Sequence, residues 1–397
     1  MTWQSLLEPD IQKFIRQHEN DDVAALALKK MPDPSCDAKR ILDQIKARQK
    51  AKVKLPQWLE HDDIVFPPAN IMEQASSSAT ARYKVGLVKG ESFVDLTGGA
   101  GADSWALAQH FKSGQIIEIN KDAAKLIDHN MKCLSPAASI TVHNCAAEDF
   151  VADMVAIDLA IIDPARRDDA RKGKFKLEDC APDITALLPT LLQKTKSIMI
   201  KTSPMLDISE GIKALKSEQG SVHEVHVIEW RNECKELVFI LKASLCEQPK
   251  IIAVSINDQG EVQKYLSFTQ EEEANTSLAL SMPKKYLYEP GPAFQKSGGF
   301  NSIARRFNVE KLHAHTHLYS SDELRPDFPG RAFKICAQYP PKKENIPVKK
   351  ANLKARNFPM STENLRKKLK IQDGGPDYLF ACTLQDGSKA ILHGQKT

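Results

Sequence analysis

Short apolar runs alternate with segments of helical periodicity from about residue 91 onward. The apolar runs lie at 92–97, 114–120, 139–144, 158–163 and 197–203. Apolar residues recur every three or four positions in the segments between them, at 102–111, 121–134 and 183–195. This alternation predicts an α/β fold, a Rossmann-like, doubly wound and mostly parallel sheet with helices on both faces. Two further runs, 222–229 and 236–243, are expected to form an antiparallel pair that completes the sheet.

Different patterns flank this region. Residues 1–85 carry the three- and four-residue spacing of amphipathic helices, with aspartates and serines at candidate N-caps. A hairpin is predicted after the shift in composition near 246–250, and the remainder is basic and rich in Pro, Gly and aromatic residues, as in small α+β domains. We therefore predict four parts: 1–85, 86–245, 246–325 and 326–397.

Charge is unevenly distributed along the chain. The segment 283–370 holds 19 Lys and Arg against 7 Asp and Glu, a net charge of +12 in a chain whose total is only +4. The rest of the chain is therefore acidic, at −8. A basic module joined to a mildly acidic body favours a polyanionic partner such as RNA, although a basic solvated surface would give the same count.

Several classes of protein are disfavoured by composition. No apolar stretch is long enough for a membrane span, and the first residues lack the basic and apolar regions of a secretory signal, so we expect a cytoplasmic protein that does not enter membranes. The eight cysteines form no CxxC pair, and the one local histidine cluster, HAHTH at 313–317, has no thiol or carboxylate beside it. We expect reduced thiols, a surface strand at 313–317, and no bound metal.

A glycine-rich turn, TGGAGADS, follows the first strand of the sheet. Glycine at such a turn lets the backbone approach a ligand closely. A P-loop would end in Gly-Lys-Ser/Thr, and a dinucleotide fingerprint would need glycine where the chain has Ser104. An acid followed by glycines at alternating positions fits an S-adenosylmethionine (SAM) loop instead. The predicted cofactor contacts in this loop are Asp95, Thr97, Gly98, Gly99 and Gly101.

Polar or turn residues also end the next three strands. Glu118 ends the second strand, where an acid can accept both ribose hydroxyls of a nucleoside. Cys145 and Ala146 follow the third strand and are expected at the adenine, and the fourth strand ends in Asp163 and Pro164. Ligands of open α/β sheets collect at this edge, so four such ends together indicate a site more strongly than the glycine loop alone.

These motifs resemble those of the class I SAM-dependent methyltransferases over residues 91–243. DLTGGAGAD resembles their first motif, IEIN their ribose-binding acid, and DPARR occupies the place of the Asp/Asn-Pro-Pro-Tyr/Phe motif of nucleic-acid amino-methyltransferases. EQASSSATARYK, KTSPMLD and NECKEL are similar to a bacterial group that carries C-terminal ferredoxin-like and THUMP-like domains, and YLYEPGPAF, DFPGRAF and ARNFPMSTENLRKKL are similar to that C-terminal part. The resemblance implies a methyltransferase domain at 86–245, a hairpin and ferredoxin-like domain at 246–325, and an RNA-binding THUMP-like domain at 326–397. It also implies SAM as cofactor and RNA, tRNA or rRNA, as substrate.

The DPARR turn is the predicted catalytic segment, with Asp163, Pro164 and Arg166 as its members. In the resembled enzymes the Asp accepts a hydrogen bond from the target amine and the aromatic residue stacks on the extruded base. This chain has Arg166 in place of the aromatic residue, so the guanidinium stacks on a base, binds a phosphate, or forms a salt bridge with a nearby acid. Arg167 has the same alternatives and is predicted to contact RNA. Carbon-5 methylation needs a thiolate, which neither DPARR nor KTSP supplies, and Cys180 is expected to be buried. A base nitrogen is therefore the predicted target.

Two further features are open to more than one interpretation. Lys201, at the end of the fifth strand, is expected either to contact RNA phosphate or the cofactor carboxylate, or to cap its strand. The basic module holds interleaved cations beside Phe358, which suit a surface that follows a phosphate backbone. The residues predicted there to bind RNA are Lys349, Lys350, Lys354, Arg356, Arg366 and Lys367. The sequence thus predicts a SAM-dependent RNA methyltransferase, the alternatives being a small-molecule or protein methyltransferase and a non-catalytic RNA-binding protein.

Overall fold

The computed structural model describes residues 3–28, 37–135, 137–166 and 176–397. The chain forms two compact units: the first holds residues 1–225, 236–247 and 256–261, and the second holds 226–235, 248–255 and 262–397. None of the described helices has the length and apolar character needed to cross a membrane.

Five α-helices precede the first strand in the described part of the first unit, with 3-10 helices at Trp3–Leu7 and Pro56–Glu60. The α-helices are α1 (Pro9–Gln17), α2 (Val23–Leu26), α3 (Ala38–Lys54), α4 (Ala69–Gln74) and α5 (Ser78–Val85). Asp37 caps α3 by accepting a hydrogen bond from the backbone N–H of Lys39, and the Ser77 and Thr80 side chains form a reciprocal capping box on α5. The helical prediction for this region is therefore confirmed, and Ser77 acts as a helix cap.

Parallel strands and helices then alternate, as the periodicity predicts. In chain order the elements are β1 (Ser92–Asp95), α6 (Ala102–Ala108), β2 (Ser113–Ile117), α7 (Lys121–Leu134), β3 (Ser139–His143), α8 (Ala147–Asp153), β4 (Ile157–Ile162), β5 (Ala165–Arg166), β6 (Cys180–Ala181), α9 (Ile184–Lys194), β7 (Thr195–Thr202), α10 (Ile208–Ala214), β8 (Ser221–Trp230) and β9 (Glu233–Lys242). Strands β3, β2, β1, β4 and β7 lie side by side and all run parallel. The Rossmann-like fold class is confirmed.

The sheet is larger than the sequence pattern predicts. Strand β9 lies between β7 and β8, and β10 (Lys250–Ile256) and β11 (Val262–Phe268) continue the same sheet beyond β8. The expectation that β8 and β9 complete the sheet is therefore wrong, because β10 of the following hairpin is hydrogen-bonded to the free edge of β8. Two short strands after β4, β5 and β6, pair with each other in an antiparallel arrangement.

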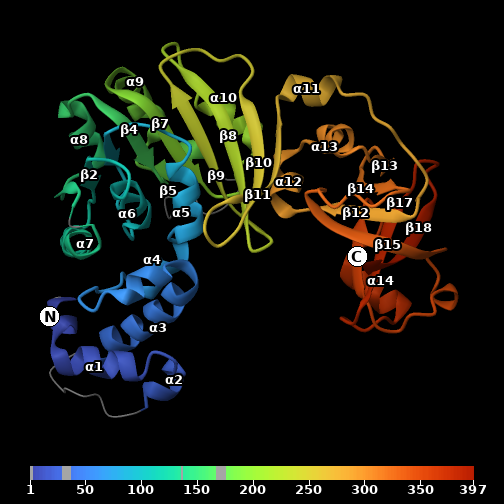
Figure 1. Ribbon diagram of the computed structural model, residues 1–397, viewed down its shortest axis with the longest axis horizontal. Helices are drawn as coiled ribbons and strands as arrows, with labels where there is room; N and C mark the ends of the chain where they lie inside the picture. Colours follow the sequence, from blue (N-terminus) through green and yellow to red (C-terminus); the bar gives the residue numbers. More distant parts are fainter. Residues whose placement is uncertain (1–2, 29–36, 136, 167–175) are drawn as a thin grey trace. The chain divides into compact units, whose positions relative to one another are not determined.

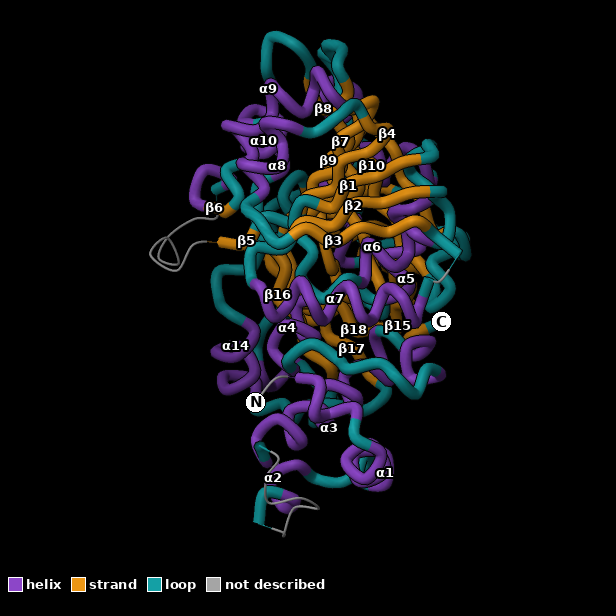
Figure 2. Tube along the Cα trace, turned by 90° about the vertical axis from the view of Figure 1, so that its left-hand side faces the viewer, coloured by secondary structure: helices purple, strands orange, loops and turns teal. Residues whose placement is uncertain are grey.

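Helix α7 separates the strands from the N-terminal helices. It lies between β2 and helix α3 in both views (Figures 1 and 2). Its buried residues recur every three or four positions, from Ala124 to Leu134, and Asn120 caps its first turn. Residues of α3, α4 and α7 line one cavity together with Gly99 and Glu118, which follow β1 and β2.

The second unit contains a seven-stranded sheet and four helices. Its elements, after the parts of the large sheet that it includes, are α11 (Gln270–Asn275), β12 (Tyr286–Pro290), α12 (Pro292–Ser297), α13 (Phe300–Phe307), β13 (Glu310–His313), β14 (Thr316–Ser321), β15 (Gly330–Tyr339), β16 (Asn352–Arg356), α14 (Thr362–Leu369), β17 (Asp377–Thr383) and β18 (Lys389–Lys396). The strand order is β13-β14-β12-β15-β18-β17-β16. Thr316 of β14 donates a hydrogen bond to the backbone carbonyl of Thr383 in β17 at 2.7 Å, so the two ends of this sheet approach each other.

Two sequence expectations bear on this unit. The HAHTH segment is a turn between β13 and β14, with Thr316 buried, and so is not a single surface strand. Among the described residues, no group of three or more His, Cys, Asp or Glu is arranged to hold a metal ion. The four-part division at 85, 245 and 325 remains a prediction.

Candidate active site

The glycine loop joins β1 to α6 and is fixed to the neighbouring strand. The backbone N–H of Gly98 donates to the carbonyl of Ile117 at 2.9 Å, and a Cβ on Gly98 would lie only 2.9 Å from the Ile116 side chain. Gly99 and Gly101 have φ values of +54° and +80°, in the left-handed region that favours glycine. The loop conformation therefore requires glycine at these positions, as the SAM-loop interpretation predicts.

Asp95, at the end of β1, holds this loop in place through hydrogen bonds. Its carboxylate accepts hydrogen bonds from the backbone N–H of Thr97, at 3.0 Å, and from the Ser104 hydroxyl. Burial raises the pKa of Asp95 to about 6, although these two hydrogen bonds oppose the shift. Because Asp95 is almost fully buried, the structure assigns its side chain a role in holding the loop, and its predicted cofactor contact remains a prediction.

Glu118 follows β2 and faces the glycine loop. One carboxylate oxygen accepts the backbone N–H of Gly99 at 3.1 Å, and the other accepts that of Asn120 at 2.8 Å. Glu118, Gly99 and Asn120 line a cavity of about 900 Å³ whose other walls include residues of α3, α4 and α7. This volume falls in the range of small-molecule sites. The loop and the predicted ribose-binding acid therefore open into the same cavity.

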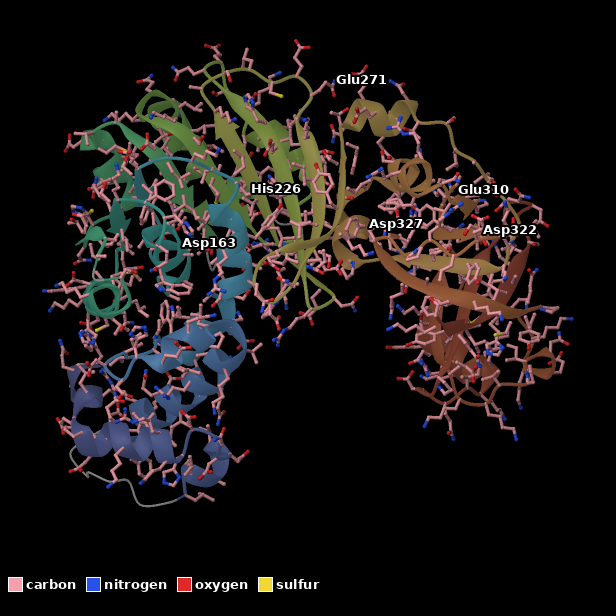
Figure 3. The ribbon with its side chains drawn as sticks, viewed as in Figure 1. Asp163, His226, Glu271, Glu310, Asp322 and Asp327 are labelled. Carbon is pink, nitrogen blue, oxygen red and sulfur yellow. The ribbon has the colours of Figure 1, made fainter. Side chains whose placement is uncertain are left out.

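Asp163 lies directly beside the glycine loop. Its backbone N–H donates to the Thr97 hydroxyl at 2.7 Å, so the end of β4 is joined to the end of β1. Figure 3 labels Asp163 at the end of the strands that faces the N-terminal helices. Asp163, Thr97, Gly98 and Gly101 also line a second, smaller cavity of about 40 Å³. Two motifs that lie 66 residues apart in the chain thus meet at one point.

The remaining members of the DPARR turn differ in their surroundings. Pro164 is buried, whereas Arg166 is half-buried and lies in β5, opposite Cys180 of β6. Cys180 is completely buried, as expected, and its thiol contacts the carbonyl of Lys176. Arg167 lies outside the described residues. Strand pairing therefore fixes the backbone of Arg166 next to the site.

The predicted adenine contacts lie at the next strand end. Cys145 and Ala146 follow β3, and Ala146 is the N-cap residue of α8. Burial raises the pKa of the Cys145 thiol. Neither residue is among the described residues that line the two cavities, so their contact with adenine remains a prediction.

A buried charge cluster behind Asp163 is absent from the sequence prediction. Lys201, at the end of β7, has its ammonium 2.5 Å from an Asp163 carboxylate oxygen. Lys84 of α5 bonds both Asp103, at 2.8 Å, and Glu236, at 2.9 Å. The Lys84 side chain is only 2% exposed, so it depends on these two acids for compensation. The sequence around Lys84 could not indicate this cluster, because the acids that pair with Lys84 lie far along the chain, in α6 and β9.

The predicted RNA contacts divide into two sets in the second unit. The first set is engaged by acids: Lys354 and Arg356 both bond the buried Glu289, at 2.9 and 2.8 Å, and Arg366 bonds Asp373 at 2.7 Å. The second set, which we call the exposed lysine set, is fully on the surface and consists of Lys349, Lys350 and Lys367. All six cations of the two sets lie on or next to β16 and α14, in the same part of this unit.

Comparison with known proteins identifies the domains that follow the large sheet. Residues 286–329 match the model of a ferredoxin-like domain, and residues 330–396 match that of a THUMP domain-like family. A search of curated proteins finds no match.

One solved structure resembles the chain over its full length. It is a candidate methyltransferase from Porphyromonas gingivalis W83, with 29% identity and a TM-score of 0.86, and the match covers 100% of this chain and 99% of that chain. A candidate RNA methyltransferase from Pyrococcus horikoshii and an rRNA methylase from Streptococcus thermophilus match at 13% and 14% identity, both with a TM-score of 0.31. These two matches cover 58% and 42% of this chain and 100% and 94% of those chains.

The class of protein follows from the fold, the site and the first of these structures. The chain has a methyltransferase fold, and it carries a ferredoxin-like domain and a THUMP-like domain after it. The resemblance drawn from the sequence motifs is thereby confirmed.

Proposed function

We propose that the chain is a SAM-dependent methyltransferase that acts on RNA, tRNA or rRNA, at a base nitrogen. The observation that carries this proposal is the junction of three strand ends. Thr97 bonds the backbone of Asp163, and Glu118 bonds the backbone of Gly99, so the glycine loop contacts both the predicted ribose acid and the predicted target acid.

The residues at this edge fit the cofactor. Each Glu118 oxygen uses one acceptor site for a backbone N–H and retains another, so the carboxylate can also accept two ribose hydroxyls. Gly99 has no close neighbour where a Cβ would lie, apart from the Thr97 carbonyl at 3.6 Å, so its backbone is open to a ligand. Ile119, the next residue after Glu118, is 75% exposed and offers an apolar surface to a nucleoside.

The chemistry requires mainly alignment. When bound, SAM supplies a methyl group that is open to direct displacement by a nitrogen lone pair. Asp163 is our proposed acceptor for the N–H of the target, which orients that lone pair and takes up the proton that the nitrogen releases. Buried Pro164 rigidifies the turn. Arg166 replaces the aromatic residue of related motifs, and its planar guanidinium can stack on a base in the same position.

The THUMP-like domain and the exposed lysine set support RNA as the substrate. Lysines without acidic neighbours neutralise phosphates and release counterions, which gives binding without base specificity. The base to be methylated is then selected at the Asp163 edge.

The test is transfer of label from methyl-labelled SAM to total RNA by the purified protein. We expect label in RNA that ribonuclease releases, and at least a 100-fold lower rate for Asp163→Asn. The matched control is Asp153→Asn, an exposed acid at the end of α8. Label in protein or small molecules, or no label at all, would contradict the proposal.

A further inference from the structure

We infer that Lys201 is a positioning residue for methyl transfer, which acts by holding the Asp163 carboxylate in its working orientation. The inference rests on the proposed function. It replaces the alternatives drawn from sequence, in which Lys201 contacts a phosphate or the cofactor carboxylate or caps its strand.

Lys201 contacts one carboxylate oxygen of Asp163 closely, and it does so from the buried side of that carboxylate. The Lys201 ammonium lies 2.5 Å from Asp163 Oδ2, and the two residues come from the adjacent strand ends of β7 and β4. The Lys201 side chain is 10% exposed and that of Asp163 is 43% exposed. One carboxylate oxygen is therefore fixed from the protein side, which leaves Oδ1 as the acceptor for a target N–H.

Lys201 is itself held from behind. Its ammonium donates to the Ser76 hydroxyl at 3.2 Å and lies 3.7 Å from Asp103. Ser76 also bonds Asp103 and Lys84, at 2.8 and 2.7 Å. Burial alone would lower the pKa of Lys201, but Asp163 and Asp103 outweigh it and hold that pKa well above its usual range. The lysine is therefore a fixed cation with little freedom to move.

Stability alone does not account for this arrangement. Lys84 is shared by Asp103 and Glu236, so charge balance explains why the cluster holds a second lysine, but not why Lys201 lies 3.7 Å from Asp103 and nearer to another acid. The closest partner of Lys201 is instead Asp163, the most exposed acid of the cluster, which water could solvate. Burying a lysine destabilises the folded state, and an ion pair with a solvent-exposed acid contributes little free energy to offset this. The arrangement is explained if the benefit lies in the orientation of Asp163 at the cavity.

Orientation matters here because direct displacement depends on alignment. A misplacement of about 1 Å at the reacting groups costs a rate factor on the order of 100. Without the ammonium, the Asp163 side chain can rotate toward water or toward the glycine loop. Lys201 thus affects the rate through Asp163.

The experiment compares Lys201→Met and Lys201→Arg in the full chain. For Lys201→Met we expect kcat on RNA to fall by about 100-fold, while the Kd for S-adenosylhomocysteine stays within about threefold of wild type. Lys201→Arg keeps the charge and should recover at least 10-fold of that loss. The matched control is Lys196→Met, at the other end of the same strand, where an exposed lysine pairs with Asp158. Its kcat should stay within about twofold.

A double-mutant comparison separates positioning from structural support. In an Asp163→Asn background, Lys201→Met should lower kcat by less than about threefold further, because the residue that Lys201 orients is already impaired. This pair removes both charges together. If the single Lys201→Met protein does not fold, the double variant is compared with Asp163→Asn alone, and a further drop of more than about threefold contradicts the inference.

The outcomes distinguish the inference from the function on which it rests. A wild-type protein that labels no RNA refutes the proposed function, and the role of Lys201 with it. A wild-type protein that labels RNA, with Lys201→Met at full kcat or with fully additive losses in the double variant, refutes the role of Lys201 alone.

Discussion

Replacement of Glu118 by alanine tests the cofactor site directly. The side chain is held by two backbone N–H groups, of Gly99 and Asn120, which orient both oxygens toward the large cavity. Each oxygen then has one acceptor site for a ribose hydroxyl. A hydrogen bond to a charged group contributes about 1.5–3 kcal/mol, so the loss of two costs at least about 3 kcal/mol. We therefore expect the Kd for S-adenosylhomocysteine to rise by a factor of roughly 150.

Isothermal titration calorimetry measures this change, and thermal melting checks that the loop survives the substitution. Asp122→Ala is the matched control, because Asp122 is exposed, lines the same cavity and lies four residues further along the chain. Its Kd should stay within about threefold of wild type. If the Glu118→Ala protein melts like wild type and binds S-adenosylhomocysteine with unchanged affinity, Glu118 does not bind the ribose hydroxyls.

Three further predictions concern charge. Glu289→Gln leaves three cations around a neutral buried side chain, and we expect a loss of about 3 kcal/mol in the free energy of unfolding, measured in urea at pH 7. These cations outweigh burial and lower the pKa of Glu289, so the difference from wild type should be full above the ordinary glutamate pKa and should shrink as the pH falls through the lowered pKa; a difference that does not change with pH would contradict the ion-pair account. Burial raises the pKa of Asp95 from 3.8 to about 6, so the free energy of unfolding of the wild type should decline as the pH rises through this window. Asp95→Asn should remove up to roughly 3 kcal/mol of that decline. If the free energies of unfolding of the two proteins, measured in urea, change with pH in the same way, this prediction is wrong. Alanine at all three positions of the exposed lysine set should reduce the slope of log Kd for RNA against log salt by about two, whereas a Lys213/Lys216 double-alanine control should leave the slope unchanged.

Local chemistry made much of the candidate site predictable from the chain. The end of each parallel strand falls at the same edge of the sheet, so Gly99, Glu118 and Asp163 could be assigned to one place from their order alone. The glycine loop was predictable for the same reason, because two of its residues adopt φ values that favour glycine. The hydrogen bonds from Gly99 to Glu118 and from Asp163 to Thr97 agree with that expectation.

Side-chain partners across the fold were not predictable in this way. Lys354 and Arg356 have the sequence pattern of phosphate contacts, but Glu289 reaches them because the two ends of the seven-stranded sheet approach each other. Lys84 and Glu236, which lie 152 positions apart in the numbering, form a buried pair that periodicity cannot indicate. The sequence gives the charge of a residue. Whether that charge can bind a ligand depends on whether the fold places an oppositely charged side chain beside it.

The sequence by itself determined the alternation of strands and helices, the glycine loop and the acids at the strand ends, since these follow from local backbone preferences and from the burial of continuous apolar strands. Only the tertiary structure decided that Lys201 faces Asp163, that Lys354 and Arg356 are held by Glu289, and that helices from the start of the chain wall the cavity beside Glu118. The physical reason is that ion pairs and cavities depend on distances between segments far apart in the chain. Those distances are set by the packing of the whole fold and not by the residues on either side.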